Sequence, residues 1–140
     1  MTYSRSPLVS GGLFAAYITL PLVAKDLRLR SPVDFEQVRA NGKSWTSDLV
    51  VAVVRPNVLG HNRYGFAVGR RVGKAVARNR AKRLMRESAR KLHPQLSQGH
   101  DVIFIARNRV GEATTQAAID AAVEGVLTRA GLVNRADTTQ

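Results

Sequence analysis

One segment limits what this chain can fold into more than any other. Residues 69–91, GRRVGKAVARNRAKRLMRESARK, contain ten basic residues and a single acid, Glu87. Cations crowded in this way repel one another and oppose compaction unless a polyanion neutralises them. The whole chain of 140 residues has a formal net charge of +12. This charge favours nucleic acid as the partner, ahead of an anionic membrane or an acidic protein.

The spacing of apolar residues predicts how this segment is displayed. On a helix over residues 75–92, one side gathers Ala77, Ala81, Leu84, Met85, Ser88 and Leu92, and the other gathers Arg78, Asn79, Lys82, Arg83, Arg86 and Arg90. We expect the first side to pack on a sheet and the second to face outward. Like charges four residues apart destabilise a free helix, so an ordinary solvated face does not explain them. The small residues of the apolar side disfavour a membrane surface.

The turn before this helix adds three cations, Arg70, Arg71 and Lys74, next to Gly69 and Gly73. Backbone N–H groups exposed at a strand-to-helix junction can accept a phosphate. The Gly-Lys-Ser/Thr ending of a nucleotide-binding phosphate loop is missing, so that class of site is excluded. Together, turn and helix predict polyanion binding through arginine forks, which suit phosphates.

The rest of the chain predicts the helices and strands of one compact domain. Ser31, Pro32 and Gly42 delimit a helix over 31–42, with Val33 and Val38 facing a core together with Phe35 or Leu29. A final helix over 114–130 directs Ile119, Val123, Val126 and Ala130 inward and stops at Gly131.

Strands are expected at 44–55 (one or two), 63–69 and 101–107. In the segment 63–69, Tyr64, Phe66 and Val68 alternate with Gly65, Ala67 and Gly69. A glycine face on a strand predicts that another group approaches it closely.

The ends of the chain differ from this domain, which we place at 27–131 with a tail over 132–140. Residues 1–26 are expected to be a poorly ordered extension. Their apolar run, 13–24, is too short to span a bilayer, and a signal-peptide core is the alternative interpretation. The chain has no cysteine, which excludes disulfides and thiolate metal sites and suits a reducing cytoplasm.

The sequence does not show the residue clusters that a catalytic site needs. A protein nuclease requires clustered carboxylates or paired histidines. Asp34, Asp48, Glu87 and Asp101 fall on separate elements, and His61, His93 and His100 fall in loops or at element ends, where we expect solvated or capping roles. We therefore predict no catalytic residue and no metal site in the protein.

The segment RYGFAVGRRVGKAVARNRAKRLMRE, residues 63–87, resembles the signature of the bacterial ribonuclease P protein subunit. The hallmark is Arg78-Asn79-Arg80, followed by Lys82, Arg83 and Arg86. The resemblance extends to residues 27–44, with a characteristic phenylalanine at Phe35, and to 101–110. Arg39 departs from it, because some members carry an aromatic residue there.

The resemblance implies an α+β fold, a two-layer α/β sandwich that is ribosomal protein S5 domain 2-like. Its element order is α-β-β-β-α-β-α, with a four-stranded sheet. It also implies a left-handed β-α-β crossover through the basic helix, against the common hand.

The resemblance further implies a non-catalytic, RNA-binding subunit of ribonuclease P. Such a subunit helps the catalytic RNA to remove the 5′ leader from precursor tRNA by binding both that RNA and the leader, and it broadens the substrate range. It implies one protein per RNA, Mg2+ held by the RNA rather than by the protein, and a cytoplasmic location without a membrane partner. The alternative is a stand-alone structural RNA-binding protein of the ribosomal type.

The expected RNA-binding residues are Arg70, Arg71, Lys74, Arg78, Asn79, Arg80, Lys82, Arg83, Arg86 and Arg90. The candidates for leader binding are Phe35, Arg78, Asn79, Arg83 and Arg86. Unstacked bases of a single strand can stack on aromatic rings, and phosphates pair with arginine. Phe35 has a second interpretation as a core residue.

Overall fold

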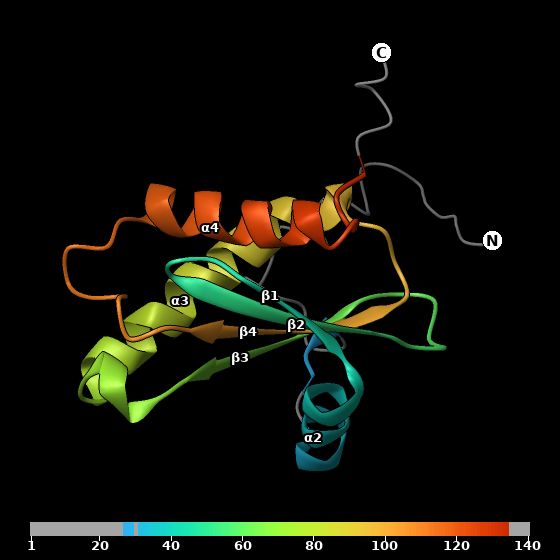
Figure 1. Cartoon of the computed structure of the whole chain (residues 1–140), viewed down its shortest axis with the longest axis horizontal. Helices are drawn as coiled ribbons and strands as arrows, with labels where there is room; N and C mark the ends of the chain where they lie inside the picture. Colours follow the sequence, from blue (N-terminus) through green and yellow to red (C-terminus); the bar gives the residue numbers. More distant parts are fainter. Residues whose placement is uncertain (1–26, 30, 135–140) are drawn as a thin grey trace.

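The computed structural model describes residues 27–29 and 31–134. The elements follow one another as α2 (Pro32–Asn41), β1 (Lys43–Thr46), β2 (Val50–Pro56), β3 (Arg63–Val68), α3 (Ala75–Leu92), β4 (His100–Ala106) and α4 (Gln116–Arg129) (Figure 1). Two 3-10 turns, η2 (Arg70–Val72) and η3 (His93–Gln95), flank α3. This order confirms the predicted α-β-β-β-α-β-α fold. The expected extension over 1–26 lies outside the described residues.

The four strands form one mixed sheet in the order β1-β2-β4-β3. β2 pairs antiparallel with both β1 and β4, whereas β3 and β4 are parallel, with Val68 opposite Ala106. The predicted strand region 44–55 divides in two because Ser47 closes a turn, accepting at Oγ from the Val50 N–H at 3.1 Å. α3 thus connects the parallel, adjacent strands β3 and β4. The left-handedness of this β-α-β crossover stays a prediction.

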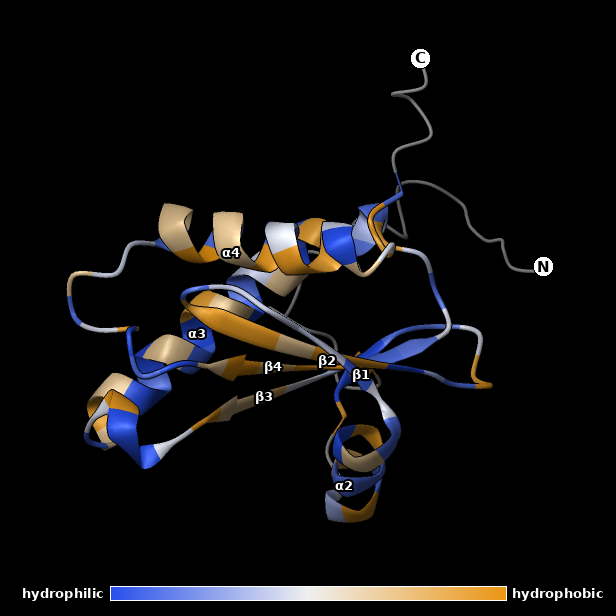
Figure 2. Ribbon diagram, in the orientation of Figure 1, coloured by the Kyte–Doolittle hydropathy of each residue, from blue (hydrophilic) through white to orange (hydrophobic). Residues whose placement is uncertain are grey.

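Helices cover both faces of the sheet (Figure 1). On the α3–α4 side, the larger core includes Tyr64, Met85, Phe104 and Val123. On the other side, α2 covers a smaller cluster of Leu29, Val38, Val53 and Ile103. Since β2 and β4 are apolar on both faces, each face needs a cover, and much of β2 has the orange of apolar residues in Figure 2. The two-layer description therefore fits the α3–α4 side, and α2 adds a partial third layer.

Phe35 explains the glycine face of β3. A Cβ atom added at Gly65 would lie 2.8 Å from Cε2 of Phe35, which is closer than real Cβ contacts. The predicted close approach to this face is therefore confirmed. The core position predicted for Val33 is wrong, because Val33 is 68% exposed while Val38 is fully buried. Five residues along a helix turn the side chain by about 140°, so these two valines cannot share a face.

The packed domain continues past the predicted boundary at residue 131. Leu132 is buried, and Val133 forms an antiparallel bridge with Leu96. The Asn134 N–H donates to the Gln95 carbonyl at 2.6 Å. In α4, the inward positions of Ile119, Val123 and Val126 are confirmed, and Leu127 is a further buried residue; Ala130, which follows the helix, is half-buried.

Candidate nucleic-acid interface

The turn between β3 and α3 exposes three cations on a fixed backbone. Val72 is half-buried and packs against the larger core, whereas Arg70, Arg71 and Lys74 are exposed. Gly73 has φ +143°, a conformation that favours glycine, and its N–H donates to the Arg70 carbonyl at 3.1 Å. One apolar anchor and one glycine therefore hold the basic turn in place.

The helix α3 has the two faces that the sequence predicted. Ala81, Met85 and Ser88 are buried, and Ala89, which the apolar pattern did not single out, is buried with them. Asn79 and Arg83 are exposed on the opposite side, and Lys82 is half-exposed. Leu84, expected in the core, is half-buried at its edge. The helix thus packs on the sheet through Ala81, Met85, Ser88 and Ala89 and directs Asn79 and Arg83 to solvent.

Three of the predicted RNA-binding arginines have intramolecular partners. Arg78 donates from Nη1 to the Gly73 carbonyl at 2.8 Å, which closes the turn before the helix. Arg80 donates to the carbonyls of Gly111 and Thr114, at 3.1 and 2.7 Å, in the loop before α4. Arg90 forms an ion pair with Glu87 at 2.5 Å. These side chains are less available to a partner than the sequence alone suggested.

Arg86 is the most buried member of a group of three guanidinium groups. It lies 5.9 Å from the centre of the Phe66 ring, a distance within the range of cation–π attraction. Burial, together with the charges of Arg28 and Arg83, lowers the pKa of Arg86 from its ordinary value, yet arginine stays charged. The like charges of Arg28, Arg83 and Arg86 repel one another, and a bound anion would relieve this repulsion. The sequence pattern did not identify Arg28 as a member of this group.

Asp34 and Asp101, two of the acids expected to lie apart, both form ion pairs with Arg63. Arg63 donates to both carboxylate oxygens of Asp101, at 3.0 and 2.8 Å, and to Asp34 at 3.2 Å. Asn57 also donates to Asp101 at 2.8 Å. Within 27–29 and 31–134, the structure contains no group of three or more acids and histidines arranged to hold a metal ion. The ion pairs of Arg63 with Asp34 and Asp101 join α2, β3 and β4.

His93 has the capping role that was one of the two roles expected for the histidines, but its side chain is not solvated. His93 follows α3, where its N–H donates to the Ala89 carbonyl, but its ring is buried. Its Nδ1 lies 2.7 Å from the Tyr64 hydroxyl, which itself accepts from the Asn62 amide at 3.1 Å. A neutral ring fits this contact, and the Tyr64 hydroxyl donates to Nδ1 in the tautomer that has its proton on Nε2.

Burial, with a smaller effect of the charge of His61, lowers the pKa of His93 from 6.5 to about 4. Below pH 6.5, His93 therefore becomes protonated in the unfolded chain but stays neutral in the folded protein. The free energy of unfolding consequently decreases as the pH is lowered. We expect the free energy of unfolding to drop by roughly 2 kcal/mol between pH 7 and pH 5, measured by urea denaturation. His93→Gln should lack this part of the slope. Equal slopes in both proteins would contradict the buried neutral histidine.

Phe35 does not lie beside the cationic face of α3. Its ring packs on Gly65, on the α2 side of the sheet, whereas Phe66 and Arg86 lie on the opposite side. The ring is half-buried, so it is partly a core residue and also has an exposed portion. The structure therefore separates the leader-binding candidates onto two faces.

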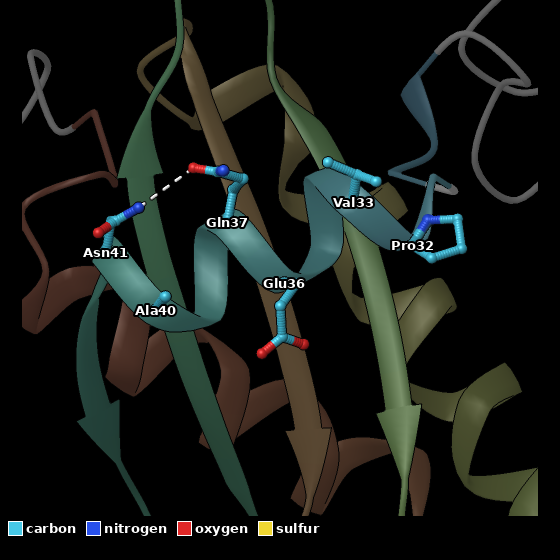
Figure 3. A pocket seen from close by; sticks show the side chains of 6 residues that line it. All are labelled: Pro32, Val33, Glu36, Gln37, Ala40 and Asn41. Carbon is cyan, nitrogen blue, oxygen red and sulfur yellow. Dashed lines mark hydrogen bonds between the residues drawn. The ribbon is translucent and has the colours of Figure 1, made fainter.

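The outer surface of α2 has a shallow hollow, shown in Figure 3. Its lining consists of Pro32, Val33, Glu36, Gln37, Ala40 and Asn41. Gln37 and Asn41 are joined by a hydrogen bond of 3.2 Å. Glu36 is the charged residue of this lining, so the hollow lacks the cations that an RNA site needs.

No helix in the described part of the chain is long and apolar enough to cross a membrane.

Comparisons with known proteins agree with this geometry. A family model described as Ribonuclease P matches residues 23–131. The ribonuclease P protein component of Roseiflexus castenholzii is 38% identical over 109 residues, which cover 78% of this chain and 89% of the relative. The component of Caldanaerobacter subterraneus is 43% identical over 86 residues, 61% of this chain and 74% of the relative.

Solved structures give the same result. The ribonuclease P protein of Thermotoga maritima superposes with a TM-score of 0.68 at 30% identity, covering 73% of this chain and 96% of that one. The Staphylococcus aureus protein superposes with a TM-score of 0.69 at 29% identity, covering 77% and 98%.

Proposed function

Since this chain belongs to the family of bacterial ribonuclease P protein components, we propose that it binds the catalytic RNA and the 5′ leader of precursor tRNA together. The chain is the RNA-binding, non-catalytic subunit of ribonuclease P, and the RNA subunit is its partner. The proposal adds the leader as a second ligand, a broader range of substrates and a ratio of one protein to one RNA.

The observation that carries this proposal is the cationic face of α3 and of the turn before it. Arg70, Arg71, Lys74 and Arg83 are exposed and, within the described chain, belong to none of the ion pairs. Uncompensated arginine and lysine on one side of a helix whose other side is core are suited to an RNA phosphate backbone.

The leader is proposed to lie near Arg28, Arg83 and Arg86. A single strand that also reaches the exposed portion of the Phe35 ring has to pass along the β3 side of the sheet. Residues 27–29 lie there, with the Leu29 N–H donating to the Tyr64 carbonyl at 2.8 Å. Phosphates on the three arginines and one base on the ring would combine charge and stacking, as single-strand binding proteins do.

In this proposal the protein contributes charge and shape, while the RNA subunit holds Mg2+ and cleaves the phosphodiester. Cations that neutralise RNA phosphates let two RNA molecules approach each other at a lower concentration of Mg2+. We place the assembly in the cytoplasm, where precursor tRNA is made.

Reconstitution tests the proposal directly. Precursor tRNA is incubated at low Mg2+ with the protein alone, with the cognate RNA subunit alone, and with both. We expect 5′-leader removal with both, much slower removal with RNA alone, and none with protein alone. Cleavage by the protein alone would contradict the proposal. RNA binding without faster cleavage would favour the ribosomal-type alternative.

A further inference from the structure

A second basic segment leaves the sheet beside the first. β3 and β4 are parallel and in register, with Val68 opposite Ala106. Residues 69–74 and residues 107–115, which follow the two strands, therefore leave the same end of the sheet. Figure 1 shows both segments at the left end of the molecule, one leading into α3 and the other into α4.

The segment 107–114, called the β4 loop below, carries two exposed cations, Arg107 and Arg109. Arg107 donates to the Ser47 carbonyl at 2.8 Å, which holds its side chain over the β1–β2 turn. The β1–β2 turn contains one acid, Asp48, and the β4 loop contains one, Glu112. In the described structure neither of them forms an ion pair. The loop thus adds positive charge to the end of the sheet that displays Arg70 and Arg71.

The β4 loop has a fixed conformation. Val110 is 3% exposed, and its N–H donates to the Arg107 carbonyl at 3.0 Å. The Gly111 N–H donates to Oγ1 of Thr114 at 2.9 Å. Arg80 reaches across from α3 and donates to the carbonyls of Gly111 and Thr114. Arg109 is therefore displayed from a loop that a buried valine and an arginine fork hold against α3.

We propose that the β4 loop is a second contact to the RNA subunit, in which Arg109 binds backbone phosphate and Arg80 positions the loop. The inference rests on the proposed function. Residues 107–114, RNRVGEAT, contain no aromatic residue, so this loop suits phosphates rather than unstacked bases. A rigid loop also matches a folded RNA better than a flexible leader, since it loses little conformational entropy on binding.

Binding of the RNA subunit without substrate tests the role of Arg109. We expect Arg109→Ala to weaken binding several-fold and to reduce the salt slope by about one, and Arg109→Glu to weaken it further. Melting temperatures should not change. The matched control is Arg39→Ala, an exposed arginine of α2 on the opposite face of the sheet, which should bind as the wild type does.

Two outcomes would overturn the role of Arg109. One is unchanged affinity of Arg109→Glu for the RNA subunit. The other is a loss confined to the binding of precursor tRNA by the assembled enzyme, which would assign the phosphate to the substrate. If the wild-type protein itself fails to bind the RNA subunit, the proposed function fails instead.

A double-mutant cycle tests the positioning role of Arg80. Arg80→Lys keeps the charge, but an ammonium group lacks the fork that reaches two carbonyls. We expect Arg80→Lys to weaken RNA binding and Arg109→Ala to have a smaller effect in that background, because the loop is no longer held in place. Equal effects of Arg109→Ala in both backgrounds would overturn the positioning role. Circular dichroism verifies that each variant is folded.

Discussion

Replacing Met85 by alanine should lower the free energy of unfolding by about 2–5 kcal/mol, because it leaves a cavity where α3 packs on the sheet. Met85 is 1% exposed and belongs to the larger core. The neighbouring Leu84 is half-buried, so Leu84→Ala should cost less. Urea denaturation of the two variants and the wild type measures these differences.

Arg83→Ala is the matched control, because Arg83 lies two residues earlier on the same helix and is exposed. Its loss relieves repulsion from Arg86, whose pKa already reflects that charge. We therefore expect unchanged or slightly higher stability for Arg83→Ala. If Arg83→Ala destabilised the protein as much as Met85→Ala, the assignment of core and surface faces on α3 would be wrong.

The sequence predicted α3 well because its signals are local. The helix was expected over 75–92 and spans Ala75–Leu92. Gly73 and Pro94 mark its ends, and the apolar spacing between them indicates the buried face. Ser31 is confirmed as the cap of α2 in the same way, accepting from the Asp34 N–H at 3.4 Å.

Partners that are distant in sequence could not be predicted. Arg80 lies 31 and 34 residues from the carbonyls that it binds, so the Arg-Asn-Arg pattern did not reveal its attachment to the β4 loop. The same holds for Arg63, which joins Asp34 and Asp101 across three elements. A hydrogen-bond partner of this kind depends on the register of the sheet, which a single sequence does not specify.

The site itself was predicted as a set of residues rather than as a shape. Arg70, Arg71, Lys74 and Arg83 are exposed as expected, but Arg86 packs over Phe66 and Arg28 joins it. Phe35 was grouped with the arginines through the family resemblance, whereas the fold places it across the sheet. Element order and helix phase are local properties, while the juxtaposition of side chains follows from packing.

RNA binding should depend steeply on salt. If the cationic turn, α3 and their neighbours contact about six to ten phosphates, affinity for the RNA subunit should fall by about 10³–10⁵ between 50 and 200 mM salt. Each phosphate contact releases condensed counterions, and added salt opposes that release. Arg70, Arg71, Lys74, Lys82, Arg83 and Arg86 would provide most of these contacts.

The slope of log affinity against log salt concentration tests this electrostatic account most directly. Titration of the labelled RNA subunit with wild-type protein should give a slope of about −4 to −9. Arg83→Ala should reduce its magnitude by roughly one without lowering the melting temperature, and Arg39→Ala should leave it unchanged. A nearly flat plot for the wild type, or an unchanged slope in Arg83→Ala, would contradict the proposal that this face of α3 binds RNA.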